Sequence, residues 1–368
     1  MTVIPTEQAH LHVAALNDPG RKGKNNEDRY AVSSYHFSAE DAMPSLFAIV
    51  ADGIGGHLAG EVAAEMVVDY VSQAVAESNA QTPLKTITRA VESANQAIVS
   101  KAKEERTKQG MGATCVCAWV IGDRLYTGSV GDSRIYLMRG AAIQQLSTDH
   151  TWIQEAMDKG ILTPAQARGH PNVHVIRRYI GSAEPPEVDF RLRLNSEEDD
   201  AQLKANQGVR LQAGDTLLLC SDGLTDLVWN DEILEIVRAA QNLEKAAQKL
   251  IDLANERGGH DNITVVLLSV PNGEGLKRKQ DNNSLLWIIG GMAVFLAVAS
   301  VLIGLIWNLI QPDATPTPTL AQIATASPVI ETTVAPPTAT MLSTLPPPTS
   351  TLAPTSGPTY TPWPTNEP

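Results

Sequence analysis

The chain has 368 residues and a formal net charge of −13, from 28 Lys and Arg against 41 Asp and Glu. This charge argues against a nucleic-acid-binding protein, because the phosphates of DNA and RNA must be met by clustered Lys and Arg. The length exceeds what one typical domain needs, so we expect one domain with appended segments.

The first predicted strand runs from His10 to Leu16, where apolar and polar residues alternate. A turn at residues 17–20 leads into a basic loop, residues 21–28, which ends on two carboxylates. Residues 29–36 resume as a strand. Residues 46–57 then form a continuous apolar run that ends in a glycine-rich turn, a pattern typical of a fully buried strand.

Asp52 stands at the end of that apolar run and is followed directly by Gly53. A carboxylate delivered by a buried strand is costly unless it has a partner. Glycines in the turn would let an ion or phosphate approach the backbone closely. The alternative is a strand that simply ends in a turn with a surface Asp.

The middle of the chain predicts helices that arrive in pairs and strands that pair locally. Amphipathic patterns predict helices over residues 60–77 and, after Pro83, to about residue 108. The remaining expected elements are strands over 112–120, 124–130, 134–139, 215–220 and 263–270, and helices over 231–240 and 243–256. Such an order favours an α+β fold with antiparallel sheets and helices packed outside them.

Two segments do not fit this regular pattern. Residues 148–181 combine two short helical pieces with a polar cluster (His170, Asn172, His174, Arg177 and Arg178), and a long insertion of this kind is usually functional or disordered. Residues 196–208 are acidic, and we expect a solvated surface loop there. The three cysteines, in apolar runs without a Cys-x-x-Cys pair, favour neither a zinc site nor a disulfide framework and fit a reducing compartment.

Residues 285–310 are apolar and uncharged. As a helix they would be about 39 Å long, enough to cross a bilayer core with some tilt. Basic residues 277–279 precede this run and none follows it, which places the preceding domain in the cytoplasm. The resulting division is a domain over 1–271, a basic linker over 272–284, a single-pass transmembrane helix over 285–310, and a Pro- and Thr-rich, disordered extracytoplasmic tail over 311–368.

Four aspartates share one context, because each lies at a predicted strand boundary with Gly or Asn nearby. They are Asp28, Asp52, Asp222 and Asp261. Strand ends that bring these carboxylates into one cavity would need hard cations to offset their repulsion. Oxygen ligands favour Mg²⁺ or Mn²⁺ over zinc. Two such ions would clamp a phosphate and activate water for hydrolysis of a phosphoester.

At this point the chain resembles the PPM family, the protein phosphatase 2C-like, metal-dependent Ser/Thr phosphatases. The resemblance covers about residues 10–270 and rests on six motifs in the family's order: Asn26-Glu27-Asp28, Asp52-Gly53-Ile54-Gly55-Gly56-His57, Gly112-Ala113-Thr114, Val130-Gly131-Asp132-Ser133-Arg134, Ser221-Asp222-Gly223-Leu224 and Asp261-Asn262-Ile263-Thr264. It implies a four-layer α-β-β-α sandwich with two metal ions between the sheets at one end.

The resemblance also implies roles for particular residues. Asp28, Asp52 with the Gly53 carbonyl, Asp222 and Asp261 would hold two Mn²⁺ or Mg²⁺ ions, and Glu27 would act through water. Asp132 and Asp226, together with Asp222, match a third and weaker metal site. Residues 148–181 occupy the place of the family's mobile flap beside the substrate cleft.

Two departures from the family's pattern concern the substrate phosphate and the general acid. Many members carry an Arg five residues before the metal-binding Asp, where this chain has Gly23; Arg21, Lys22 and Lys24 are the candidates to replace it. Some members have a His where this chain has Ile54, which cannot donate a proton. His57 is expected to be structural.

These patterns predict a membrane-anchored protein Ser/Thr phosphatase that hydrolyses phosphoserine and phosphothreonine by metal-activated water. Its partners would be phosphorylated proteins, including membrane Ser/Thr kinases and their substrates. Two alternatives stay open. One is a catalytically weak or silent phosphoprotein-binding module tethered to the membrane or wall, which Gly23 favours, and the other is a phosphatase of an anti-sigma-factor antagonist.

Overall fold

A computed structural model describes residues 4–5, 9–23, 25–36, 43–55, 58–167 and 169–272. The chain separates into two units, Met1–Ser284 and Leu285–Pro368, and the second lies wholly outside the described residues. The predicted basic linker beyond Asn272, the membrane-spanning segment over 285–310 and the Pro- and Thr-rich tail all fall there. Within the described ranges, no helix is long and apolar enough to cross a membrane.

Two antiparallel sheets form the centre of the folded part. The first has the strand order β1-β3-β4-β7-β8-β11 and the second the order β10-β9-β12-β13-β2. The strands of the first sheet are β1 (Ile4–Pro5), β3 (Arg29–His36), β4 (Pro44–Ala51), β7 (Cys115–Ile121), β8 (Arg124–Val130) and β11 (Val209–Arg210). Those of the second are β10 (Ala142–Gln145), β9 (Arg134–Arg139), β12 (Thr216–Cys220), β13 (Ile263–Ser269) and β2 (His12–Asp18).

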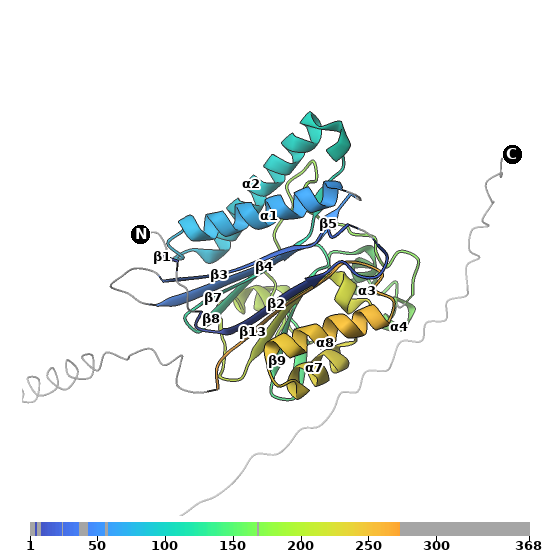
Figure 1. The fold of residues 1–368 in the computed structure, drawn as a ribbon. Coiled ribbons are helices and arrows are strands. Elements are labelled where there is room, and N and C mark those ends of the chain that lie inside the picture. Colours follow the sequence, from blue (N-terminus) through green and yellow to red (C-terminus); the bar gives the residue numbers. More distant parts are fainter. Residues whose placement is uncertain are drawn as a thin grey trace, which may run out of the picture. The chain divides into compact units, whose positions relative to one another are not determined.

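Helices cover the outer faces of both sheets (Figure 1), so the four-layer α-β-β-α prediction is confirmed. The pair α1 (Leu58–Glu77) and α2 (Pro83–Glu104) packs on the first sheet, and α7 (Asn230–Ala239) and α8 (Leu243–Glu256) pack on the second. A 3₁₀ turn (Arg106–Lys108) follows α2, so the second predicted helix ends earlier than expected.

The buried strand β4 shows why this arrangement forms. Its apolar side chains alternate between two cores: Phe47 and Ile49 pack under α1 and α2, whereas Leu46 and Val50 pack between the sheets. A strand covered on both faces needs apolar residues at every position. The continuous apolar run in the sequence therefore encoded a central strand of a four-layer structure.

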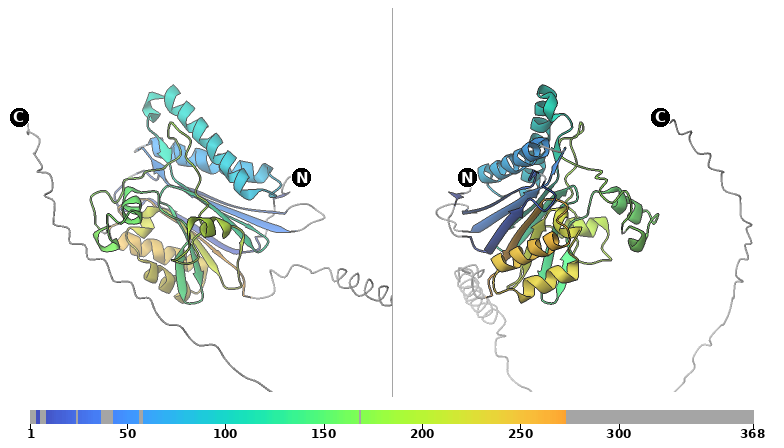
Figure 2. Two further views of the ribbon diagram at one scale, coloured as in Figure 1. Left: turned by 180° about the vertical axis from the view of Figure 1, so that it is seen from behind. Right: turned by 45° about the vertical axis from the view of Figure 1, so that its right-hand side comes forward.

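The segment 148–181 projects from one side of the sandwich (Figure 2) and carries α3 (Trp152–Asp158) and α4 (Pro164–Ala167). An isolated bridge pairs Thr151 with Ile176 near the base of the segment, and a second pairs Ala113 with Ile180. The first bridge closes the segment on itself. Its two ends are fixed to the body of the domain by the second bridge and by the hydrogen bond from the His150 N–H to the Gly131 carbonyl.

The expected solvated loop over 196–208 is wrong in part, because it contains the short helix α5 (Asp200–Ala205). Asp199 accepts from the backbone N–H of Gln202, and the Gln202 side chain accepts from that of Asp199. This reciprocal pair is a capping box, and Leu203 is buried beneath it. The predicted strand over 112–120 is also two strands, β6 (Gly112–Ala113) and β7, with Thr114 between them.

Candidate metal centre

Four strand ends meet at one end of the sandwich. In the first sheet Arg29 of β3 pairs with Ala51 of β4, and in the second Ile263 of β13 pairs with Asp18 of β2. The four predicted ligands lie within two residues of a strand end: Asp28 before β3, Asp52 after β4, Asp222 after β12 and Asp261 before β13. The structure therefore brings together carboxylates that are far apart in the sequence.

Asp28 is fully buried, and two hydroxyls hold one of its oxygens. The hydroxyls of Ser221 and Thr264 both donate to Asp28 Oδ2 at 2.7 Å. Its other oxygen, Oδ1, is buried and has no hydrogen-bond partner among the described residues. The carboxylate is thus held by one oxygen while the other stays available to a cation.

Asp52 is fixed through its backbone. Its N–H donates to Thr114 Oγ1 at 2.9 Å, and the N–H of Thr114 donates to the Asp52 carbonyl at 2.8 Å. Thr114 Oγ1 also lies 2.7 Å from the hydroxyl oxygen of Ser133, beside Asp132. These bonds explain why the strand pattern breaks at Thr114: that residue leaves the ladder to position Asp52.

Asn262 joins the loops around Glu27 and Asp261. Its Oδ1 accepts from the backbone N–H of Glu27 at 2.8 Å, and its Nδ2 donates to the Pro19 carbonyl at 3.0 Å. Gly20 has a φ of +77°, and a Cβ there would lie 2.2 Å from the Asp261 carbonyl oxygen. Only glycine allows the first loop to approach the last one this closely.

Glu27 and Gly53 both pack against the first turn of α1, at Gly60. A Cβ on Gly60 would come within 2.7 Å of Glu27 Oε2, and a Cβ on Gly53 within 2.4 Å of the Gly60 carbonyl. The small strand β5 (Gly53–Ile54), which pairs with β6, holds this turn against the helix. The glycines therefore let the turn after Asp52 pack directly on the helix backbone.

The carboxylates repel one another strongly. Burial, together with the charges of Asp222 and Asp261, raises the pKa of Asp28 to about 7. Burial and the charges of Asp28, Asp222 and Asp132 hold the pKa of Asp52 well above its usual range. The Asp52 carboxyl shares a hydrogen bond with Asp222 that favours a proton on Asp52. Without cations, the group keeps protons to reduce its own charge.

The donor set fits divalent cations. Closely packed carboxylate oxygens are the ligands that Mg²⁺ and Mn²⁺ prefer. Two of them here, Asp28 Oδ1 and Asp132 Oδ1, are buried and have no hydrogen-bond partner among the residues that the structure describes. Asp132 and Asp226, predicted as parts of a third site, lie in the same group as Asp222. Burial and the charge of Asp222 raise the pKa of Asp226 to about 7 and hold that of Asp132 well above normal.

A cavity of about 210 Å³ opens beside Asp132, Asp222 and Asp226. Side chains from α3 and from the segment 148–181, including His174, form its other wall. Arg134 also lines it, but its guanidinium is engaged by Asp149, with Nη2 at 2.6 Å from Oδ2. The cavity is the cleft in which the predicted flap faces the carboxylates.

The predicted phosphate-binding residues are placed only in part. Arg21 and Lys22 are exposed, and the backbone N–H of Arg21 donates to the Gly259 carbonyl, two residues before Asp261. Lys24, Gly56 and His57 lie outside the described residues. Gly23 has a φ of +67°, and a Cβ there would meet nothing within 4 Å in the described part of the chain.

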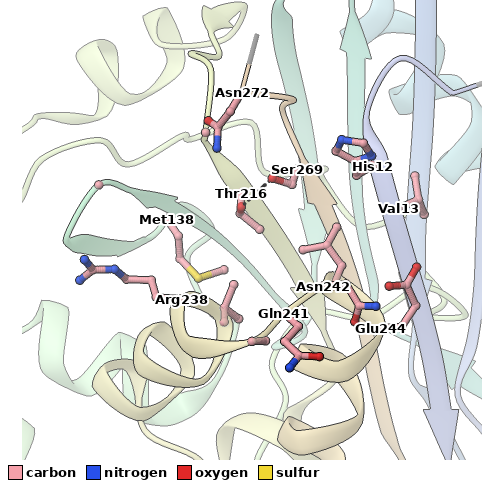
Figure 3. A pocket seen from close by; sticks show the side chains of 15 residues that line it. His12, Val13, Met138, Thr216, Arg238, Gln241, Asn242, Glu244, Ser269 and Asn272 are labelled. Carbon is pink, nitrogen blue, oxygen red and sulfur yellow. Dashed lines mark hydrogen bonds between the residues drawn. The ribbon is translucent and has the colours of Figure 1, made fainter.

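A larger cavity, of about 660 Å³, lies at the other end of the second sheet (Figure 3). Residues lining it include His12 at the start of β2, Thr216 at the start of β12 and Ser269 at the end of β13. These are the strand ends remote from Asp28 and Asp222. As far as the structure describes its walls, none of the predicted ligands lines it.

Several residues that build the site received no role from sequence reasoning. The quoted motifs contain four of them: Ser221, Thr264, Thr114 and Asn262. The sequence shows that these residues lie next to the predicted ligands, but it does not show which atoms they bond. The sequence marks His174 only as part of a polar cluster. A polar side chain in an irregular insertion suggests a functional role, but it does not indicate that His174 lies beside Asp226.

The metal-free protein should lose stability as the pH rises from about 5 to about 8. Asp28 is fully buried and has a pKa of about 7 when folded, against roughly 4 when unfolded. The pKa values of Asp52 and Asp132 are raised in the same direction, whereas Asp226, whose side chain is 36% exposed, contributes less because solvent screens it. Between the unfolded and folded pKa values the folded state binds more protons, so the free energy of unfolding falls with rising pH. His10 is half-buried, and that burial lowers its pKa, so it changes the free energy of unfolding in the opposite direction; it is, however, a single group.

We expect the Tm in chelator to fall by about 5 °C over this interval, which corresponds to roughly 2 kcal/mol for a domain of this size. Differential scanning calorimetry at pH 5, 6.5 and 8, with and without Mn²⁺, measures it. A saturating divalent cation should flatten the profile, because it takes over the role of the protons. A profile that is flat without metal would contradict the electrostatic account.

Comparisons with known proteins agree with this geometry. A family model described as "Protein phosphatase 2C" matches residues 20–257. The chain is 36% identical over 262 residues to the serine/threonine phosphatase stp of Listeria monocytogenes, covering 70% of this chain and 95% of that protein.

Two solved structures are also similar. The S. agalactiae serine/threonine phosphatase superposes with a TM-score of 0.61 at 31% identity, covering 71% of this chain and 99% of that one. The catalytic domain of the phosphatase PstP, solved in complex with 2 manganese ions, gives a TM-score of 0.57 at 32% identity, covering 70% of this chain and 97% of that domain.

Proposed function

This chain belongs to the protein phosphatase 2C family, and from that premise we propose that it removes phosphate from phosphoserine and phosphothreonine at a centre of two Mn²⁺ or Mg²⁺ ions. Asp28, Asp52, Asp222 and Asp261 would be the ligands, with the Gly53 carbonyl, and Glu27 would act through water. Asp132 and Asp226, with Asp222, would hold a third ion. The observation that carries the proposal is the buried Asp28 oxygen that lies among mutually repelling carboxylates without a hydrogen bond among the described residues.

The protein's own residues supply the preorganisation. Ser221 and Thr264 orient Asp28 by holding Oδ2, and Thr114 fixes the peptide of Asp52. Asn262 keeps the Glu27 and Asp261 loops at a constant separation. When bound, divalent ions in such a site lower the pKa of water and polarise the phosphoryl group. Because these bonds are already made, no reorganisation is needed when charge develops on the phosphate.

A phosphothreonine-peptide assay tests the proposal. We expect turnover that is abolished by chelation and restored by Mn²⁺ or Mg²⁺. A protein that binds phosphopeptide but shows no turnover under any metal condition would favour the phosphoprotein-binding module instead. Turnover that survives chelation would refute the metal-dependent mechanism.

Gly23→Arg should lower the KM for a phosphopeptide about tenfold, since one charge-assisted hydrogen bond to phosphate contributes about 1.5–3 kcal/mol. The structure leaves space for a side chain, but the φ of +67° makes any non-glycine residue unfavourable. Gly23→Ala, which has the same backbone cost and no charge, is the matched control. Equal KM values for the two variants and the wild type would show that position 23 does not reach the phosphate.

We further propose that residues 285–310 anchor the enzyme in a membrane with the phosphatase domain in the cytoplasm and the tail on the far side. The support is the length of the uncharged apolar run and the basic residues 277–279 before it. Its substrates would then include membrane Ser/Thr kinases and the proteins they phosphorylate. Recovery of the full chain in the soluble fraction after cell lysis, like that of a chain ending at Ser284, would contradict the anchor.

A further inference from the structure

His174 places an imidazole next to two carboxylates of the catalytic end. Its Nδ1 lies 3.5 Å from Asp226 Oδ2. One ligand atom from each of His174, Asp222 and Asp226 lies within 4.8 Å of the others. This separation is the one expected of donors that could share a single cation.

The backbone around His174 is held in place. Val175 directly follows His174, and its carbonyl accepts from the N–H of Trp152 at 2.9 Å. The N–H of Arg177 donates to the His150 carbonyl at 2.7 Å. Thr151 and Ile176 form an isolated bridge between these bonds. The imidazole is therefore presented from an anchored backbone although its side chain is 66% exposed.

Asp132 gives an independent indication of a ligand. This side chain is only 6% exposed, and its Oδ1 is buried without a hydrogen-bond partner in the residues that the structure describes. It lines the same cavity of about 210 Å³ as His174, Asp222 and Asp226. A buried, unpartnered carboxylate oxygen is costly, and a cation in this cavity would offset that cost.

We propose that His174 completes a transition-metal site with Asp132, Asp222 and Asp226, and that a cation bound there fastens the segment 151–176 to the catalytic carboxylates. The inference rests on the proposed function and deepens it, because it adds a nitrogen ligand from the flap. An imidazole disfavours Mg²⁺, which takes oxygen ligands, relative to a transition-metal dication. The site would therefore favour a transition-metal dication over Mg²⁺ more strongly than the all-oxygen pair of sites would.

Fastening the flap has a consequence for the cleft. The described lining of this cavity comes both from the flap, including Thr151, Ile153, Gln154, Met157 and Val173, and from the carboxylate loops. A bond from His174 to a cation held by Asp222 and Asp226 joins the two walls. Occupancy of this site would thus set how far the flap opens for a phosphoprotein.

The test uses Mn²⁺ as the probe on the purified full-length chain. Electron spin-echo envelope modulation of bound Mn²⁺ detects ¹⁴N coupling from a coordinated imidazole, and isothermal titration gives the number and affinity of the sites. We expect ¹⁴N modulation in the wild type, its loss in His174→Gln, and a roughly tenfold weaker Kd for the weakest Mn²⁺ site of that variant. His170→Gln is the matched control, because His170 belongs to the same segment but stacks on Trp152, with ring centroids 5.0 Å apart.

A second readout follows the flap itself. Mn²⁺ should slow tryptic cleavage within residues 152–180 in the wild type and in His170→Gln, whereas Mg²⁺ should not. In His174→Gln, Mn²⁺ should give no protection. A wild-type spectrum without ¹⁴N modulation, or modulation that persists in His174→Gln, would overturn the inference.

Failure of the inference is distinguishable from failure of the proposed function. If two Mn²⁺ ions still bind and phosphopeptide turnover persists while the ¹⁴N signal is absent, only the role of His174 is refuted. If no Mn²⁺ binds and turnover is absent, the metal centre itself is refuted and the inference falls with it.

Discussion

Asp222→Asn is expected to lower the turnover of a phosphothreonine peptide by more than about 100-fold, at Mn²⁺ concentrations that saturate the wild type. The loss of groups that only support metal ligands already costs about 10–100-fold. Asp222 is placed more centrally, because it contacts Asp52 and contributes to the repulsion at Asp28, Asp132 and Asp226. Initial rates over a range of Mn²⁺ concentrations measure the effect.

The same substitution should stabilise the metal-free protein. Asn removes one charge from a group of repelling carboxylates, yet its amide oxygen can still accept the hydrogen bond from Asp52. We expect the Tm in chelator at pH 8 to rise by about 3–6 °C, which corresponds to roughly 1–2 kcal/mol. Groups that bind ligands are commonly unfavourable for folding in this way.

Asp252→Asn is the matched control, because Asp252 is exposed on α8 and is bonded only to Gln248 among the contacts described. It should change neither turnover nor the Tm by a measurable amount. An Asp222→Asn enzyme that retains wild-type turnover would refute the metal assignment. A variant that is inactive and also less stable without metal would show that Asp222 is structural.

Gly223→Ala is expected to lower the Tm by about 10 °C and to reduce turnover at least tenfold. A Cβ at this position would lie 2.1 Å from the Asn262 carbonyl oxygen and 3.0 Å from its carbonyl carbon. Both atoms belong to the backbone, so the overlap is relieved only if α6 (Asp222–Thr225) moves away from the last loop. Overpacking typically costs about 1–3 kcal/mol, and an overlap with backbone atoms belongs at the upper end of that range because no side chain can rotate to relieve it. The movement would also separate Asp222 from Asp261.

Gly140→Ala separates steric overlap from backbone strain. Gly140 has a φ of +59°, and the structure places nothing within 4 Å of a Cβ there, as far as its residues are described. That variant should lose only about 1 kcal/mol and keep full turnover. Thermal unfolding and peptide assays of both variants, with and without Mn²⁺, complete the comparison. Equal losses in the two variants would contradict the proposed contact between Gly223 and Asn262.

Much of the fold could be predicted from local patterns. The apolar run of β4 encodes a strand covered on both faces, because a half-exposed strand would alternate. The amphipathic patterns of α1 and α8 encode helices that each cover one sheet. Even α5 was within reach, since Asp199 and Gln202 have the spacing of a capping box; the acidic composition of the segment concealed it.

The sequence by itself determined which carboxylates are candidates for the metal centre, because each stands at a strand end inside a short motif. Only the tertiary structure decided what each carboxylate touches. Ser221 donates to Asp28 across 193 positions and Thr264 across 236, and no local periodicity carries information over such distances. The pairing register of the sheets sets those contacts, and the anchoring of the flap sets the place of His174. The sequence fully specifies the chemistry of each side chain, whereas the partner that each side chain contacts depends on how distant strands align.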